Sequence, residues 1–233
     1  MSNNVNDGDW NAARVADTLL TAERSRVART SIRHEWAGLT LDVAYAAQDI
    51  ALAGRRSRGE VVTGVKLGLT SRAKQQQMGV DEPSVAWLTD AMALPAGLPI
   101  PRERLIHPRA EPEIAFVLGR PLQGPGVTAA QALSAVDKVV GAIEIIDSRY
   151  SGFHFTLADA VADNNSSGVY LTGPVMKDVS DVDLSLEACL LEVDGDVVDS
   201  ATGSAVLGHP AEALAFAANT FSARGVTLQP GWV

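Results

Sequence analysis

The chain has 233 residues, of which 46% are hydrophobic and 20% charged, with a formal net charge of −9. This composition predicts a globular protein with a substantial core, and an acidic surface disfavours nucleic acids and membranes as partners. A single cysteine, Cys189, excludes an internal disulfide, and we expect its thiol to be buried in a cytoplasmic protein. No signal peptide and no apolar run of membrane-spanning length are predicted.

Helical patterns occupy the first part of the chain. Asp9 is expected to cap the first helix, and Thr40 precedes a second apolar stripe that runs into Gly54. The basic residues 55–58 then lie at a helix C-terminus, where cations are favoured. We assign residues 1–59 to an N-terminal helical segment.

Glu60 begins a β-rich region. Runs of β-branched and aliphatic residues predict strands at 61–69, 111–118, 139–147, 169–171, 190–193 and 197–198. Helices are expected at 71–77, 128–136 and 210–223. Asp194 and Gly195 form the turn of a hairpin. We therefore predict an α+β or mixed α/β fold, with residues 60–233 as a β-rich catalytic domain.

Carboxylates give the most informative pattern. Strand side chains alternate between faces, so Glu111 and Glu113 point to one face and repel each other unless a cation lies between them. Glu144 lies alone in an apolar strand, where an ion is costly to bury. Three carboxylates from two neighbouring strands would suit Mg²⁺ or Mn²⁺. The alternatives are a solvated sheet face for the first two and a buried ion pair for Glu144.

Lys66 lies in the middle of an apolar strand. A partly buried lysine needs a partner or a function, and its charge could stabilise a developing enolate. The alternative is a lysine that reaches solvent or forms a salt bridge.

Polar residues follow the strand that carries Glu144. The short polar residues 163–167 precede a strand and could hold a substrate carboxylate or form an ordinary capped turn. Arg149 could bind the far carboxylate of a dicarboxylic substrate through its planar fork, or pair with Asp147 or Asp163.

Four blocks of sequence resemble the hydratases and decarboxylases of the catechol meta-cleavage pathway, within the fumarylacetoacetate hydrolase superfamily. They are residues 64–83 (GVKLGLTSRAKQQQMGVDEP), 105–116 (LIHPRAEPEIAF), 144–155 (EIIDSRYSGFHF) and 161–167 (VADNNSS). The resemblance runs from about residue 10 to the end of the chain. It implies a mixed β-sheet or β-roll core of the C-terminal-domain type of that superfamily.

The resemblance also implies a site. A divalent metal, Mg²⁺ or Mn²⁺, would be held by Glu111, Glu113 and Glu144, with Lys66 as the functional lysine. A small 2-oxo dicarboxylate would be the substrate, and its expected binding residues are Arg149, Asp163, Asn164, Ser166, Ser167, Leu69 and Thr70. Relatives form homo-oligomers or associate with the pathway hydratase, so we expect one of these assemblies.

Two blocks favour a decarboxylase over a hydratase. Ser84 stands where the hydratases carry an acidic residue, and residues 146–155 match the decarboxylase pattern, although residues 165–170 are more similar to hydratases. We expect metal-dependent loss of CO₂ from 2-oxo-3-hexenedioate, with Lys66 stabilising the oxygen that gains charge. The alternatives are a 2-hydroxypenta-2,4-dienoate hydratase and an inactive subunit that binds a partner enzyme, since the family continues past the position of Val233 with closing strands.

Overall fold

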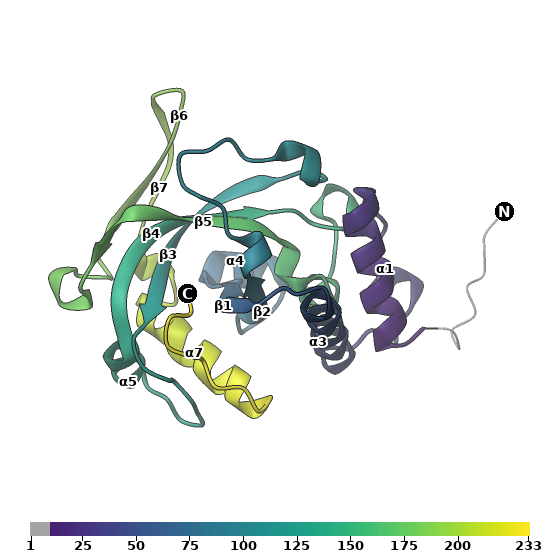
Figure 1. Ribbon diagram of the computed structural model, residues 1–233, viewed down its shortest axis with the longest axis horizontal. Coiled ribbons are helices and arrows are strands. Elements are labelled where there is room, and N and C mark those ends of the chain that lie inside the picture. The colour runs from purple at the N-terminus through teal and green to yellow at the C-terminus, as the bar shows by residue number, and fades with distance from the viewer. Residues whose placement is uncertain (1–9) are drawn as a thin grey trace.

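A computed structural model describes residues 10–233 (Figure 1). Three helices come first: α1 (Ala12–Ser25), α2 (Ile32–Glu35) and α3 (Leu41–Ser57). Asn11 caps α1 by accepting a hydrogen bond from the backbone of Arg14, while the predicted cap, Asp9, lies outside the described residues. Thr40 caps α3 as predicted, and the last turn of that helix carries Arg55 and Arg56.

Seven strands follow in three antiparallel groups, which are β1 (Val62–Gly68) with β2 (Ser84–Thr89), β3 (Arg109–Leu118) with β4 (Val136–Ile146) and β5 (Ser167–Lys177), and β6 (Ala188–Val193) with β7 (Asp196–Thr202). The remaining helices are α4 (Arg72–Met78), α5 (Ala129–Ala135), α6 (Leu157–Ala162) and α7 (Pro210–Ala223). The predicted α+β fold with a helical N-terminal part is confirmed, and the pairings within the three groups are antiparallel.

Some boundaries differ from the sequence patterns. β2 was not predicted, because the buried run 84–89 shows no alternation: all six of its residues are buried. β5 is 11 residues long, whereas only three residues were predicted as a strand. The prediction was too short because the second half of β5 is exposed and contains Pro174, which are features that disfavour a strand in the sequence pattern. Cys189 is half-buried and not buried, because the β6–β7 hairpin that carries it projects from the body (Figure 1).

Two large apolar clusters hold the fold together. In the first, α1 and α3 pack on α6 and on Tyr150, whose side chain is fully buried. In the second, α5 and α7 pack on β1, β2 and the end of β3, around Phe221. Gln48 joins the two, since its buried amide donates to the carbonyl oxygens of Val85 and Val161 at 3.0 Å each. In Figure 1, β1, β2 and α4 therefore lie between the N-terminal helices and the curved β3–β4–β5 sheet.

Strand register decides which side chains meet on that sheet. Glu111 of β3 lies directly opposite Glu144 of β4, and Glu113 lies opposite Ala142. Paired residues share a face, so the three glutamates lie on one face of the sheet. Among residues 10–233, no helix is long and apolar enough to cross a membrane.

Candidate active site

Glu111, Glu113 and Glu144 form a compact cluster of acids. Each offers a carboxylate oxygen, and these three oxygens lie within 4.8 Å of one another. The prediction that alternation and strand pairing bring the three side chains together is consistent with this geometry.

Two lysines neutralise part of the cluster. The Lys66 ammonium lies 2.9 Å from Oε2 of Glu144, and both side chains are nearly buried, at 10% and 8% exposed. The Lys74 ammonium lies 2.8 Å from Oε1 of Glu111 in a more exposed pair. Three carboxylates thus face two cations, and no salt bridge to Glu113 is present within the described part of the chain.

The electrostatics of the cluster follow from this imbalance. Glu113 is exposed and lines a cavity beside the two other carboxyls. Desolvation and the neighbouring Glu144 carboxylate raise the pKa of Glu113 to about 8. Burial also raises the pKa of Glu144, against the opposing pull of Lys66. The raised pKa of Glu113 therefore favours its neutral form in the absence of a further positive charge.

The residues fit a divalent cation. Oε1 of Glu144 is buried and has no hydrogen-bond partner, and an unpartnered buried carboxylate oxygen is costly. A hard cation with oxygen ligands would satisfy this atom and replace the proton on Glu113. Glu111, Glu113 and Glu144 would hold it.

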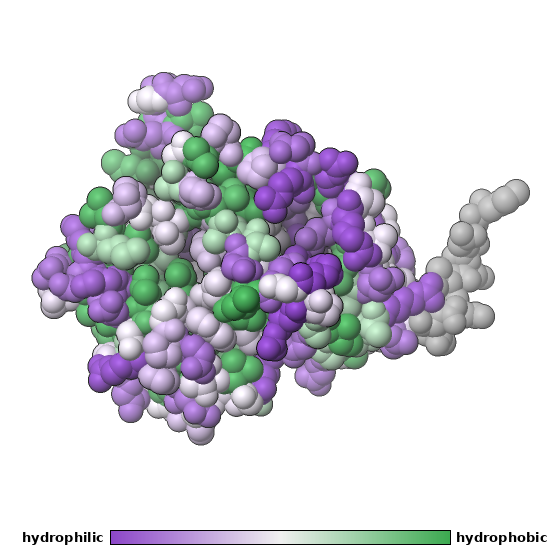
Figure 2. Space-filling view, in the orientation of Figure 1, coloured by the Kyte–Doolittle hydropathy of each residue, from purple (hydrophilic) through white to green (hydrophobic). Residues whose placement is uncertain are grey.

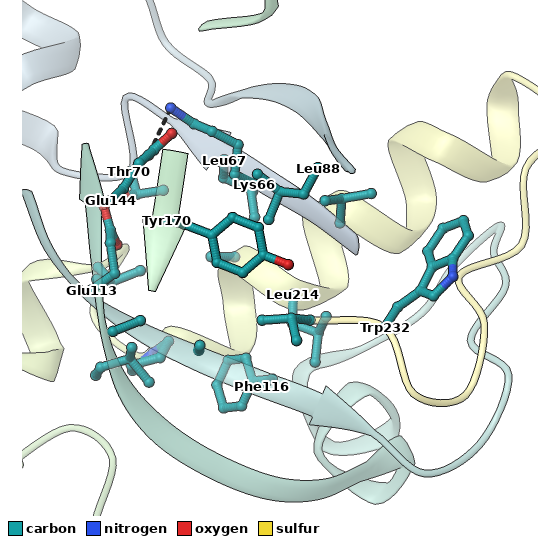
Figure 3. A pocket seen from close by; sticks show the side chains of 18 of the residues that line it. Lys66, Leu67, Thr70, Leu88, Glu113, Phe116, Glu144, Tyr170, Leu214 and Trp232 are labelled. Atoms are coloured by element: carbon teal, nitrogen blue, oxygen red, sulfur yellow. Dashed lines mark ion pairs between the residues drawn. The ribbon is translucent and has the colours of Figure 1, made fainter. Parts of the chain in front are cut away.

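A cavity of about 140 Å³ extends from the acids into the protein. Its polar end is lined by Glu113, Glu144, Lys66 and Thr70, and its other end by apolar side chains that include Phe116, Leu214 and Trp232. Figure 3 shows the Lys66–Glu144 pair at one end of this pocket and the indole of Trp232 at the other, with the Tyr170 ring between them.

Arg149 and Asp163 are placed by the structure as a buried ion pair. Their side chains are 4% and 0% exposed, and the Arg149 Nε donates to Asp163. The guanidinium also donates to the carbonyl oxygens of Asp147 (2.6 Å), Ser167 (2.9 Å) and Asp163. This geometry matches the structural alternative considered for Arg149, because its donors are directed at the protein and neither residue lines the cavity.

The other predicted substrate-binding residues divide into two groups. Thr70 lines the cavity, and Leu69 precedes it with a left-handed backbone of φ 60°. The second group lies in the turn whose Asn165 carbonyl contacts Lys66, and it consists of Asn164, Ser166 and Ser167. The Ser167 hydroxyl donates to the Asn164 carbonyl at 2.7 Å.

Tyr170 was missed by the sequence analysis, and Asn165 was placed in the polar stretch 163–167 without a predicted contact with Lys66. Tyr170 lies opposite Glu144 in the β4–β5 pairing, and its hydroxyl is 3.2 Å from that of Thr63. The carbonyl oxygen of Asn165 accepts a 3.0 Å hydrogen bond from the Lys66 ammonium. Tyr170 could have been found only with the strand register in hand, and Asn165 only with the tertiary fold, since 99 residues separate it from Lys66.

A nearly buried lysine beside a trio of strand carboxylates, at the mouth of a mostly apolar cavity, defines a candidate divalent-metal enzyme site. Residues 61–233 match the model of the fumarylacetoacetate hydrolase C-terminal family. The chain belongs to this family, and the resemblance predicted from the four sequence blocks is confirmed.

The chain is similar to individual decarboxylases and hydratases. The chain is 42% identical over 200 residues to the 4-oxalocrotonate decarboxylase of Pseudomonas sp. (strain CF600), covering 86% of this chain and 76% of that protein. It is 37% identical over 213 residues to a 2-hydroxypent-2,4-dienoate hydratase of Pseudomonas putida, covering 91% and 96%. Among solved structures it is similar to the 4-oxalocrotonate decarboxylase from Pseudomonas putida G7 complexed with magnesium and adipate, with a TM-score of 0.92, 36% identity and coverage of 95% and 84%.

Proposed function

We propose that the protein is a carbon–carbon lyase that removes CO₂ from 2-oxo-3-hexenedioate (4-oxalocrotonate) to give 2-hydroxypenta-2,4-dienoate, in the meta-cleavage degradation of aromatic compounds. Similarity to the two Pseudomonas decarboxylases supports this activity. The observation that carries it is the carboxylate trio with Lys66 at the polar end of an otherwise apolar cavity.

A divalent cation, Mg²⁺ or Mn²⁺, would be held by Glu111, Glu113 and Glu144. When bound, it supplies Lewis acidity to the 2-oxo acid end of a substrate. The solved relative contains magnesium together with adipate, a six-carbon dicarboxylate, and a second structure of that enzyme contains calcium and acetate. Both support a hard cation with oxygen ligands.

Lys66 carries the electrostatic part of the proposed reaction. The bond between C5 and C6 breaks, CO₂ leaves, and the bonding electrons pass through the C3–C4 double bond to the C2 oxygen. The Lys66 ammonium would stabilise the negative charge on that oxygen, which a proton then neutralises to give the dienol. The apolar walls of the cavity strengthen this interaction, because they exclude water and lower the local dielectric constant.

Hydration of 2-hydroxypenta-2,4-dienoate is the second candidate, favoured by the hydratase relative and its 96% coverage. Addition of water requires a group that moves protons. Ser84 is a poor acid or base, and it is 3% exposed and donates to Oδ1 of Asn165 at 3.0 Å. This feature supports the decarboxylase over the hydratase.

Product analysis tests the proposal. The purified protein is incubated with 2-oxo-3-hexenedioate and Mg²⁺ while CO₂ release and the ultraviolet band of the dienol are followed, with EDTA as control. We expect EDTA-sensitive CO₂ release that Glu113→Gln abolishes. Release that persists in EDTA would refute metal dependence, and turnover of 2-hydroxypenta-2,4-dienoate alone would favour the hydratase. A protein that neither turns over substrate nor gains thermal stability from Mg²⁺ would fit an inactive partner-binding subunit.

Assembly is also a proposal. A two-stranded hairpin is marginal alone, yet β6 and β7 are largely exposed and carry apolar side chains in contact with solvent, including Leu190, Val193, Val197 and Val198. Figure 2 shows hydrophobic surface in the region of the hairpin and β5, where Val175 and Met176 are also exposed. This supports a homo-oligomer that buries the hairpin. A cytoplasmic location and the division at residue 59 stay predictions.

A further inference from the structure

A three-residue turn lies directly under the catalytic lysine. Asn164, Asn165 and Ser166 have φ values of 50°, 50° and 59°, so three consecutive residues with side chains adopt the left-handed region. This region is unfavourable for residues other than glycine, although asparagine tolerates it better than most. Backbone strain of this kind persists only where surrounding contacts enforce it.

Contacts from several elements enforce the turn. The Asn164 side chain bridges the backbone of Trp87, accepting from its N–H at 2.9 Å and donating to its carbonyl at 2.8 Å. The Ser166 carbonyl accepts from the backbone of Asp147 at 2.7 Å. On the other side, Arg149 donates to the Ser167 carbonyl. The turn is thus tied to β2, to the end of β4 and to the buried ion pair.

The result is a carbonyl directed at Lys66. The main-chain oxygen of Asn165 lies 3.0 Å from the Lys66 ammonium, which also contacts Oε2 of Glu144 at 2.9 Å. Two acceptors in fixed positions restrict where the ammonium can lie. Because Lys66 has four rotatable side-chain bonds, this restriction reduces the conformational entropy that it would lose on reaching a productive position.

The Asn165 side chain is itself held by its surroundings. It is 7% exposed, its Oδ1 accepts from Ser84 at 3.0 Å, and its Nδ2 has no hydrogen-bond partner. Its amide lies against Gly68, where an added Cβ would come within 3.4 Å. A buried amide that leaves one donor unpaired is costly.

We propose that Asn165 is a positioning residue for Lys66: the left-handed turn presents its carbonyl oxygen to the ammonium, and Ser84 locks the side chain that keeps the turn in register. The kinetic part of this inference rests on the proposed decarboxylation. The placement of Lys66 does not, so a measurement of the lysine itself separates failure of the inference from failure of the function.

The first experiment observes Lys66 directly by NMR. The chain contains four lysines, so [¹⁵N]lysine labelling with Lys66→Met for assignment isolates the Lys66 ammonium signal. In the Mg²⁺-supplied protein we expect slow hydrogen exchange at this group. Asn165→Val, which disfavours a left-handed backbone, should speed that exchange, while Asn165→Gly, which tolerates it, should change it less. An unchanged Lys66 signal in Asn165→Val would overturn the proposal.

The second experiment is a double-mutant cycle on CO₂ release. We expect Asn165→Val to lower kcat by about tenfold with little change in KM, Asn165→Gly to lose less, and Asn165→Val to have no further effect when combined with Lys66→Met. Equal losses with and without Lys66, or a change confined to KM, would contradict a positioning role. If Asn165→Val does not fold, Asn165→Ala and Ser84→Ala provide the same comparisons with smaller perturbations.

Discussion

The buried Lys66–Glu144 ion pair sets an upper limit on the free energy of unfolding that is lost when Lys66 is replaced. Lys66→Met leaves Glu144 buried without a cation, and breaking a buried pair in this way commonly costs about 3–5 kcal/mol. Glu144 can lose its buried charge by binding a proton. Protonating a carboxyl of ordinary pKa 4.5 at pH 7 costs about 3.4 kcal/mol at 1.36 kcal/mol per unit, so this is the largest loss expected at pH 7. At pH 5 the same limit is about 0.7 kcal/mol.

Urea unfolding in EDTA measures this loss. We expect Lys66→Met to be destabilised by up to about 3 kcal/mol at pH 7 and by less than about 1 kcal/mol from the charge at pH 5. The matched control is Lys74→Met, which removes the exposed partner of Glu111 (58% exposed) and should cost at most about 1 kcal/mol. The double variant Lys66→Met/Glu144→Gln should recover stability at pH 7. A loss that is equal at both pH values, or that the double variant does not relieve, would refute the reasoning.

Three further predictions concern the metal, the buried arginine and the hairpin. Because the raised pKa of Glu113 (about 8) favours its neutral form, the metal-free fold loses stability as pH rises from 4.5 through 8. Mg²⁺ must displace the proton on Glu113, so the increase in melting temperature that Mg²⁺ produces should grow between pH 6 and 8. An increase that does not change with pH would contradict the assignment of Glu113 as a metal ligand. Arg149→Met should cost about 3–5 kcal/mol in urea unfolding, because Asp163 stays fully buried; a loss below 1 kcal/mol would argue against the ion pair. Leu190→Glu should lower the mass measured by light scattering if the hairpin is an interface, and an unchanged oligomer would place the interface elsewhere.

Local rules determined much of this protein from its sequence. Helix-start signals predicted α3 after Thr40 and α5 within residues 128–136, and the Asp194-Gly195 turn predicted the β6–β7 hairpin. The period of two along a strand put Glu111 and Glu113 on one face. These features depend on neighbours within a few residues, so a single sequence contains the information needed to predict them.

Only the tertiary structure decided which residues of the site contact one another. Glu144 joins the other acids because β4 pairs with β3 in one register, and a shift by one residue would turn it to the opposite face. The sequence left two roles for Arg149, which were binding a substrate carboxylate and forming an internal ion pair. Burial beside Asp163 favours the ion pair, since a guanidinium with 4% exposure must direct its hydrogen-bond donors at the protein. The carbonyl of Asn165 meets Lys66 across 99 residues of chain. Contacts of this range arise from packing of separate elements, and no periodicity or spacing in the sequence encodes them.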